Sequence, residues 1–517
     1  MAGMLTFEII LCLLVGGVVL TMLAPKVGLP WPAVLALAGT ALAFVPGVPK
    51  LPLDPDLALA LFFAPVLLDA AYDTSPRALL KNWRPVGSLV IVAVLLTVGV
   101  VALIARTIIP EMPWAAAIAL GAIVAPPDAA AATSVLQQVR LPQRLVLILE
   151  GESLLNDASV LLIYRVALDA VHGDVTVWTF PILVLSAVGG IVFGYALARG
   201  YLATVARFVT HQNMAASVLL QFLGTFSVWI IADRLGMSAV LTVVAYGMTI
   251  AHHSRGRMGP RERRLNFAIW EVAVFGLNVL AFLITGLQIR QIFDELNKSW
   301  SYVALAASVL VACIVVRSAW VMLYTVITRW QIARGERKRR VHRLRQITPQ
   351  TAAVIGWAGM RGIVTLGTAL ALPLDFPQRD LIQLTAFAVV LGTLGFQGLT
   401  LKPLIAWLTL PVDTSDDEAT MARGQAAQAG LESLGDDRGS RAGLLLARQY
   451  ETRVAADGDP IDGTGLVRLQ RRALGAEREQ IVALHRAGRI NDEVFGDLEE
   501  ELDWSEAALD GVRDRSS

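Results

Sequence analysis

Apolar residues occupy most of this chain in thirteen long runs, which shorter polar stretches separate. Each run approaches or exceeds the roughly 20 residues that a helix needs to cross the hydrocarbon core of a bilayer. The pattern predicts thirteen membrane-spanning helices, near residues 5–24, 30–47, 57–73, 85–106, 113–136, 146–170, 179–205, 214–233, 236–254, 266–287, 301–326, 350–374 and 381–408.

Basic residues gather in every second loop between these runs, whereas the intervening loops hold only scattered charges. Cytoplasmic loops of membrane proteins carry an excess of Lys and Arg, so the alternation predicts an N-terminus outside the cell and a cytoplasmic C-terminal tail. The same loops, including the block Arg337–Arg340, indicate topology and contact with anionic lipid, not a nucleic-acid partner.

The composition agrees with a membrane domain, because 55% of the residues are hydrophobic and 17% are charged, against about 25% charged in soluble domains. We expect a membrane transport domain over 1–410, a linker over 411–441 and an acidic, helical cytoplasmic tail over 442–517. Within the tail, Gly488–Asn491 is typical of a turn between two helices. The two cysteines indicate neither a disulfide framework nor a metal site.

The stretch Glu150–Asp157 places three carboxylates and an amide inside the sixth run. Charged side chains at membrane depth are costly and usually line a polar pathway. Because residues four apart share a helix face, Glu152 lies over Asn156, and Ser153 lies over Asp157. One face can hold a hydrogen-bonded pair while the next offers oxygen ligands to a small ion. Further ionisable residues inside the runs are Asp69, Asp128, Arg165, Glu271, Arg317 and Arg361.

The fifth and twelfth runs carry interruptions at membrane depth. Pro126 and Pro127 precede Asp128 and remove two backbone donors, so we expect this helix to break at the acid. Broken backbone at this depth is tolerated only inside protein or beside a cavity. In the twelfth run, glycines flank Arg361, which needs a carboxylate partner, and we expect that partner to be Glu152.

These two runs occupy matching places if spans one to six and eight to thirteen are two copies of one unit in opposite orientation. Interrupted helices at equivalent places of inverted repeats point to the binding site of a transporter. The expected fold is an all-α multi-pass membrane protein with about 13 transmembrane helices. It contains inverted six-helix repeats, two broken crossing helices and a small helical cytoplasmic tail.

Six segments together resemble the bacterial sodium/proton exchangers of the NhaP type, which are related to the eukaryotic exchangers. They follow the family's order over residues 1–410, and the Gly-Glu-Ser-Leu-Leu-Asn-Asp motif with a downstream Met-Arg-Gly is the most specific part. The segments are Phe62–Ala70, Pro126–Asp128, Glu150–Asp157, Trp270–Val272, Trp357–Gly362 and Gln397–Thr400.

The resemblance implies a moving core that contains the broken helices, a separate dimerisation domain and a homodimer in the inner membrane. It implies that Asp157 binds the cation and carries the exchanged proton, with assistance from Asp128 and Ser153. It also implies that Asn156 is structural and is held by Glu152, which pairs with Arg361.

Two positions bear on what is transported. Electrogenic relatives have a second Asp where Asn156 stands, so the resemblance implies electroneutral exchange. The family usually has a hydroxyl residue before the acid of span five, where this chain has Pro127. We expect Na⁺ as the cation, with K⁺ and Li⁺ as alternatives, no cofactor, and a role in pH and cation homeostasis.

The chemistry of the residues fits a secondary antiporter. Burial penalises the charged form of a carboxyl, so a buried acid can hold a proton until a cation displaces it. No phosphate-binding loop of the P-loop pattern is present in the sequence. The alternatives are an intramembrane hydrolase and a cation channel. A serine hydrolase needs an activating base, yet the histidines lie in loops, at span ends or in the tail.

Overall fold

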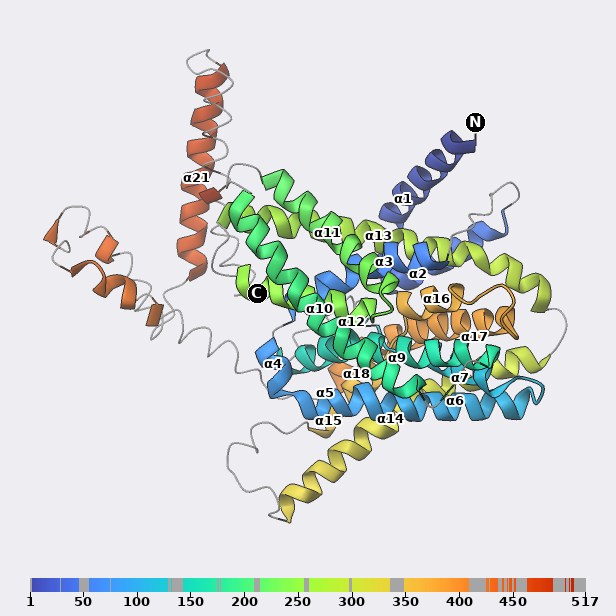
Figure 1. Ribbon diagram of the computed structural model, residues 1–517. Coiled ribbons are helices and arrows are strands. Elements are labelled where there is room, and N and C mark those ends of the chain that lie inside the picture. Colours follow the sequence, from blue (N-terminus) through green and yellow to red (C-terminus); the bar gives the residue numbers. More distant parts are fainter. Residues whose placement is uncertain are drawn as a thin grey trace. The chain divides into compact units, whose positions relative to one another are not determined.

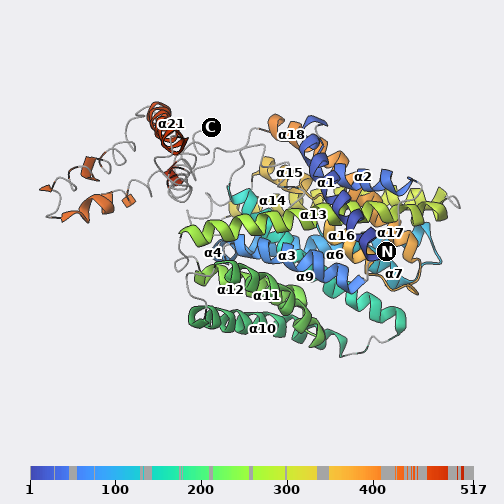
Figure 2. The ribbon, with the colours of Figure 1, turned by 90° about the horizontal axis from the view of Figure 1, so that it is seen from above.

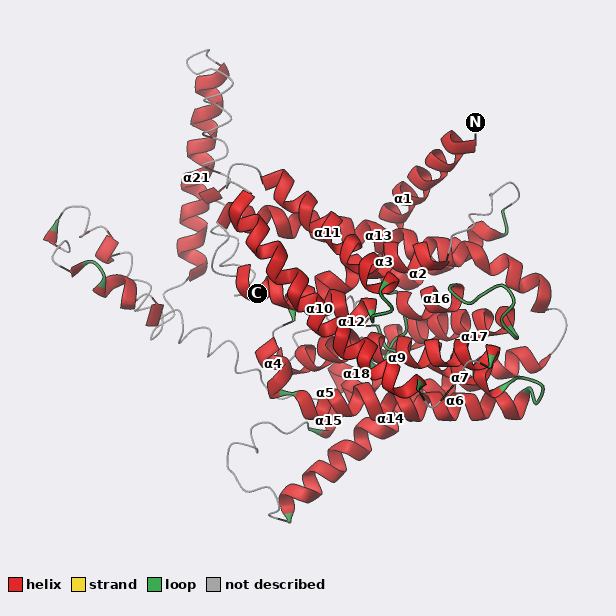
Figure 3. Ribbon diagram, viewed as in Figure 1, coloured by secondary structure: helices red, strands yellow, loops and turns green. Residues whose placement is uncertain are grey.

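The computed structural model describes residues 2–27, 29–45, 55–74, 76–128, 132, 143–173, 176, 178–208, 214–254, 260–296, 300–334, 348–408, 425–426, 428–435, 439–440, 444, 446–448, 451, 463–486, 498, 502 and 504–505. The regular elements among them are helices, without a strand (Figures 1 and 3). The predicted all-α class is therefore confirmed. The chain divides into two compact units, Met1–Val412 and Asp413–Ser517.

Six helical stretches in the described residues are long and apolar enough to cross a membrane, and three shorter helices are also apolar. Each predicted span contains a helix or consecutive helices of the first unit, although residues 129–131 and 133–136 of the fifth lie outside the described residues. The count of thirteen crossings and the inverted repeat stay predictions. The six stretches are Glu8–Lys26, Trp83–Ile108, Thr179–Thr204, Asn266–Leu287, Trp300–Gln331 and Arg379–Trp407.

Small residues allow helices α2 (Trp31–Ala43) and α13 (Pro260–Leu296) to pack at backbone distance. A Cβ at Gly39 would collide with the carbonyl of Leu283, and a Cβ at Gly286 would lie 2.7 Å from the amide nitrogen of Thr40. Association of helices in lipid depends on such close packing, because the surrounding tails are as apolar as the side chains.

Helices α10 (Thr179–Phe208), α11 (Met214–Arg234) and α12 (Ala239–Ser254) gather at one side of the first unit (Figure 2). Gly190 and Gly194 of α10 lie directly against the backbone of α12. Only 11% of the apolar window of α10 is buried, which is what a helix facing lipid requires.

The remaining helices of the first unit include those that form the two interrupted stretches and those that pack around them. The helices are α1 (Ala2–Val27), α3 (Pro55–Asp73), α4 (Pro76–Lys81), α5 (Trp83–Gly87), α6 (Val94–Ile108), α7 (Trp114–Val124), α9 (Gln143–His172), α14 (Trp300–Ala333), α15 (Pro349–Trp357), α16 (Ile363–Leu370), α17 (Arg379–Gly392) and α18 (Gly398–Trp407). Two π-helical segments, η1 (Ser88–Ala93) and η3 (Thr393–Gln397), interrupt the longer runs.

Both predicted breaks are present. Helix α7 ends at Val124 and the backbone through Asp128 is not helical. The twelfth run splits into α15 and α16, with residues 358–362 between them. These breaks lie inside the protein, because Pro126, Pro127 and the backbone around Arg361 are buried, as the absence of water at membrane depth demands.

The second unit contains helix α21 (Gly463–Arg486), which agrees with the first helix predicted in the tail. The predicted turn at Gly488–Asn491 lies outside the described residues, as does most of the second helix. The division into linker and tail stays a prediction.

Replacing Gly286 with Ala is expected to lower stability, because the added methyl group meets the backbone of α2. Overpacking of this kind costs about 1–3 kcal/mol. The test is the melting temperature of the detergent-solubilised protein. Gly276→Ala on the same helix is the matched control, since a Cβ there meets nothing within 4 Å. Equal melting temperatures for the two variants would contradict the close crossing.

Candidate functional site

Helix α9 brings four of the predicted site residues together in the buried interior. Glu152 and Asn156 are fully buried, Asp157 is 4% exposed, and Ser153 is partly buried. The amide Nδ2 of Asn156 donates to Oε1 of Glu152 at 3.2 Å, as their spacing of four residues predicts. The sequence therefore located this pair correctly.

The predicted ion pair between Glu152 and Arg361 is wrong. Glu152 instead pairs with Arg317 of α14, whose Nη1 donates to Oε1 and whose Nη2 donates to Oε2 at 2.8 Å. Arg317 Nη2 also donates to the carbonyl of Ile355 at 3.1 Å, which ties α15 to the pair. Gly359 makes room for this arginine, since a Cβ there would collide with its Cδ and Nε.

Arg361 instead donates to three backbone carbonyls, one at the end of α7, one at its own break and one on α14. Its Nε donates to the carbonyl of Val124 at 3.0 Å, its Nη1 to that of Gly359, and its Nη2 to that of Cys313 at 3.4 Å. The last carbonyls of a helix lack partners and carry partial negative charge. Arg361 therefore caps the C-terminal end of α7, and this is why it does not need a carboxylate.

Asp128 contacts the second break, where its carboxylate accepts a hydrogen bond from the N-terminal end of α16. Its amide donates to the carbonyl of Met360 at 2.6 Å, and its Oδ2 accepts from the amide of Ile363, the first residue of α16, at 3.2 Å. The first amides of a helix favour an anion. Gly362 is required here, because a Cβ at this position would overlap the Asp128 carboxylate.

Asp157 faces this crossing of the two breaks. Ser153, one turn earlier on α9, donates from its hydroxyl to the carbonyl of Pro127 at 3.3 Å. The carboxyls of Asp157 and Asp128 are close enough to interact electrostatically. Among the described residues, Oδ1 of Asp157 is buried without a hydrogen-bond partner. The site therefore offers several oxygen atoms to a small cation and one acceptor that is not already engaged.

The structure thus brings Asp157, Asp128, Ser153 and Pro127 together around the first break, with Asn156 and Glu152 behind them. Within the part of the chain that the structure describes, no group of three or more His, Cys, Asp and Glu residues suits a resident metal ion. Sequence reasoning did not identify Arg317 as the partner of Glu152, although its position at membrane depth was a signal.

The segment η3 also supports the site, and no pattern in the sequence predicted it. The hydroxyl of Thr393 accepts from the backbone amide of Arg361 at 3.1 Å. Segment η1 lies between α9 and α14: Ser159 of α9 donates to the carbonyl of Val90 at 3.3 Å, and Trp320 of α14 donates to the hydroxyl of Ser88 at 3.0 Å. π-Helical turns frequently occur beside functional sites.

Comparisons with known proteins identify the family of this chain and a solved structure with a similar fold. Residues 7–407 match the family model described as sodium/hydrogen exchanger, transmembrane. The chain is 30% identical to a protein named an uncharacterized Na(+)/H(+) exchanger from Mycobacterium tuberculosis (strain ATCC 25618 / H37Rv), over 97% of this chain and 96% of that protein. It is 31% identical to the Na(+)/H(+) antiporter NhaP of Pseudomonas aeruginosa, over 67% of this chain and 80% of that protein.

A further relative is named the sodium, potassium, lithium and rubidium/H(+) antiporter of Bacillus pumilus, at 29% identity over 71% of this chain and 56% of that protein. Among solved structures, the sodium proton antiporter MjNhaP1 from Methanocaldococcus jannaschii at pH 8 has a similar fold. The TM-score is 0.59 at 19% identity, over 77% of this chain and 100% of that one.

The assignment of Arg317 as the partner of Glu152 is testable with a double-mutant cycle. Glu152→Gln and Arg317→Met should each destabilise the protein by about 3–5 kcal/mol, because each leaves a buried charge alone. The double variant should lose less than the sum, as measured by thermal unfolding of the purified protein. A stronger coupling between Glu152→Gln and Arg361→Met would contradict the assignment.

Proposed function

This chain belongs to the sodium/hydrogen exchanger family, a family of antiporters and not of enzymes, and from that premise we propose that Asp157 binds the cation and the proton in turn. The observation that carries the proposal is the Asp157 carboxyl itself. It is 4% exposed, and its Oδ1 has no hydrogen-bond partner among the described residues. A buried acid in this condition needs either a proton or a cation.

Competition for one carboxyl produces exchange. A cation that reaches Asp157 displaces its proton, and a proton that returns displaces the cation. If only the occupied site passes from one side of the membrane to the other, a gradient of either species drives the other without ATP. Alternating access of this kind is the usual scheme for secondary transporters.

The proposed ligands are hard oxygen atoms, which small monovalent cations prefer. Asp157 and Asp128 supply carboxylates, and Ser153 supplies a hydroxyl that is held by the carbonyl of Pro127. We propose Na⁺ as the principal cation, with K⁺ and Li⁺ as further candidates, since relatives carry names with Na⁺ alone or with several alkali ions. No cofactor takes part in this scheme.

The surrounding groups keep the ligands in place. Arg361 and Pro127 maintain the break at the end of α7, and the Glu152–Arg317 pair holds Asn156. Asn156 is uncharged, so Asp157 is left as the residue of α9 that gains and loses charge at the site. We therefore propose electroneutral exchange of one proton for one cation.

The alternation of basic loops supports an orientation with the N-terminus outside and the tail in the cytoplasm. Together with the family, it supports a multi-pass protein of the inner membrane that serves pH and cation homeostasis. A homodimer is proposed by resemblance to the family.

Asp157→Asn is expected to abolish exchange, because an amide neither carries the proton nor neutralises the cation. The assay uses inside-out vesicles with an acidic interior, to which Na⁺, K⁺ and Li⁺ are added separately while the internal pH is followed. Asp169→Asn, an exposed acid on the same helix, is the matched control and should retain activity. Cation-dependent proton flux in Asp157→Asn at the control rate would refute the site.

Electroneutral exchange predicts that the rate does not depend on the membrane potential. Proteoliposomes in which a gradient of a permeant anion such as thiocyanate imposes a potential should exchange Na⁺ for protons at the rate seen without the potential. Acceleration or slowing according to the sign of the potential would show net charge movement and would contradict the one-for-one stoichiometry.

A further inference from the structure

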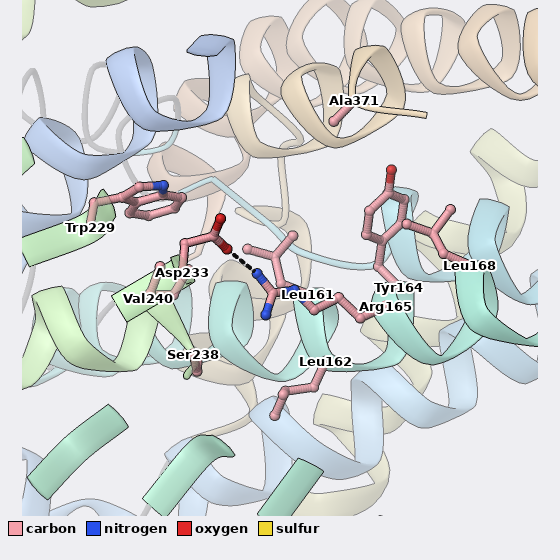
Figure 4. Close-up of a pocket in the computed structure, with 11 residues that line it drawn as sticks. Leu161, Leu162, Tyr164, Arg165, Leu168, Trp229, Asp233, Ser238, Val240 and Ala371 are labelled. Carbon is pink, nitrogen blue, oxygen red and sulfur yellow. Dashed lines mark hydrogen bonds and ion pairs between the residues drawn. The ribbon is translucent and has the colours of Figure 1, made fainter. Parts of the chain in front are cut away.

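A cavity of about 150 Å³ lies between α9, α11 and α12, and Ala371, which follows α16, also lines it (Figure 4). Its wall combines apolar side chains with Arg165 and Tyr164 of α9 and with Asp233 of α11. In the proposed orientation, this end of the first unit faces the outside of the cell, because the basic loops lie at the opposite ends of these helices.

The cavity continues the helix face that carries Asp157. Leu161, Tyr164 and Leu168 line it and follow Asp157 by four, seven and eleven residues, which is the spacing of one face of an α-helix. Arg165 lies about 12 Å beyond Asp157 along the helix axis, at 1.5 Å per residue. Leu161, the lining residue nearest to the buried acid in the sequence, follows Asp157 by about one turn.

An ion pair bridges the helices at this cavity. Arg165 Nη2 donates to Oδ1 of Asp233 at 2.6 Å, and the two side chains are 43% and 50% exposed. Figure 4 shows the pair at the centre of the lining residues. Exposed pairs are screened by water and contribute little net stability. This contact can therefore break and reform readily, unlike the buried pair of Glu152 and Arg317.

The helices on the two sides of the pair belong to separately packed groups. Helix α9 packs closely on α7 and η1 but only lightly on α12. Helices α10 and α12 are joined at backbone distance through Gly190 and Gly194. Helices α11 and α12 pack mainly on each other, on α10 and on α3, so movement of α9 past them disturbs little packing between α9 and this group.

We propose that this cavity is the outer section of the cation path to Asp157 and that the Arg165–Asp233 ion pair is the latch that closes it. The inference rests on the proposed exchange. Antiport requires that Asp157 never opens to both sides at once, so the outer section must close while the inner side is open. When the latch opens, Arg165 leaves the Asp233 carboxylate, which then attracts an incoming cation.

The first test links the two sides of the latch. Arg165→Cys and Asp233→Cys are combined in a Cys12→Ser background, where the remaining Cys313 is buried, and a short, reducible, membrane-permeant thiol cross-linker joins them. Cross-linking is expected to reduce Na⁺-driven proton flux at least tenfold, and reductant is expected to restore it. Full flux in completely cross-linked protein would overturn the proposal.

The matched control links two helices within one group. Arg199 of α10 and His253 of α12 contact each other at 3.0 Å, and the same reagent on Arg199→Cys with His253→Cys should leave the flux unchanged. Equal loss in both cross-linked pairs would overturn the placement of the moving boundary. The Cys12→Ser parent without reagent separates this outcome from the proposed function, which fails if the parent shows no cation-dependent flux.

A second measurement does not depend on the cysteine variants. Asp233→Asn should raise the half-saturating Na⁺ concentration several-fold when Na⁺ is applied to the outer face, and leave the value for the inner face unchanged. Asp169→Asn, at the same end of α9, controls for loss of negative charge near the surface. An equal change on both faces, or none, would overturn the role of Asp233.

Discussion

The structure depends on the way in which two broken helices complete each other at membrane depth. Helix α7 ends with carbonyls that have no helical partner, and α16 begins with amides in the same condition. Arg361 from the second break donates to one of these carbonyls, that of Val124, and Asp128 from the first break accepts from one of these amides, that of Ile363. The positive charge of Arg361 lies at the negative, C-terminal end of the α7 dipole, and the negative charge of Asp128 lies at the positive, N-terminal end of the α16 dipole. Each break therefore supplies a hydrogen-bond partner to the other.

This reciprocal arrangement fixes the position of Asp128 before any ion arrives. One carboxylate oxygen is held by α16, and the amide of the same residue is held by Met360. Asp157 lies opposite on a continuous helix and has a buried oxygen that is not engaged by the described residues. The two acids therefore differ in their surroundings, because Asp128 is hydrogen-bonded to the second break whereas Asp157 keeps an oxygen free of such contacts with the described residues. This difference is why we propose Asp157 as the group whose charge changes.

The helices and both breaks could be predicted from the sequence, because apolar length, two consecutive prolines in the first break and glycines in the second are local signals. The partner of Glu152 could not. Arg317 and Arg361 both lie at membrane depth, and the choice between them depends on which arginine reaches the orphan carbonyls of α7. Likewise, the glycines around Arg361 indicated close packing, but only the structure shows which groups pack there. The missing Cβ of Gly359 leaves room for the Arg317 side chain, and that of Gly362 leaves room for the Asp128 carboxylate.

The amide at position 156 follows from the same buried pair. Both oxygens of Glu152 accept from Arg317, and one of them also accepts from Asn156. A carboxylate at position 156 would remove that donor and place a second negative charge against Glu152, which burial makes costly. The structural pair therefore favours an uncharged neighbour for Asp157. In the exchange that we propose, the need to satisfy Glu152 would therefore limit the groups on α9 that can gain and lose a proton, and the same cluster of side chains would bear on both stability and stoichiometry.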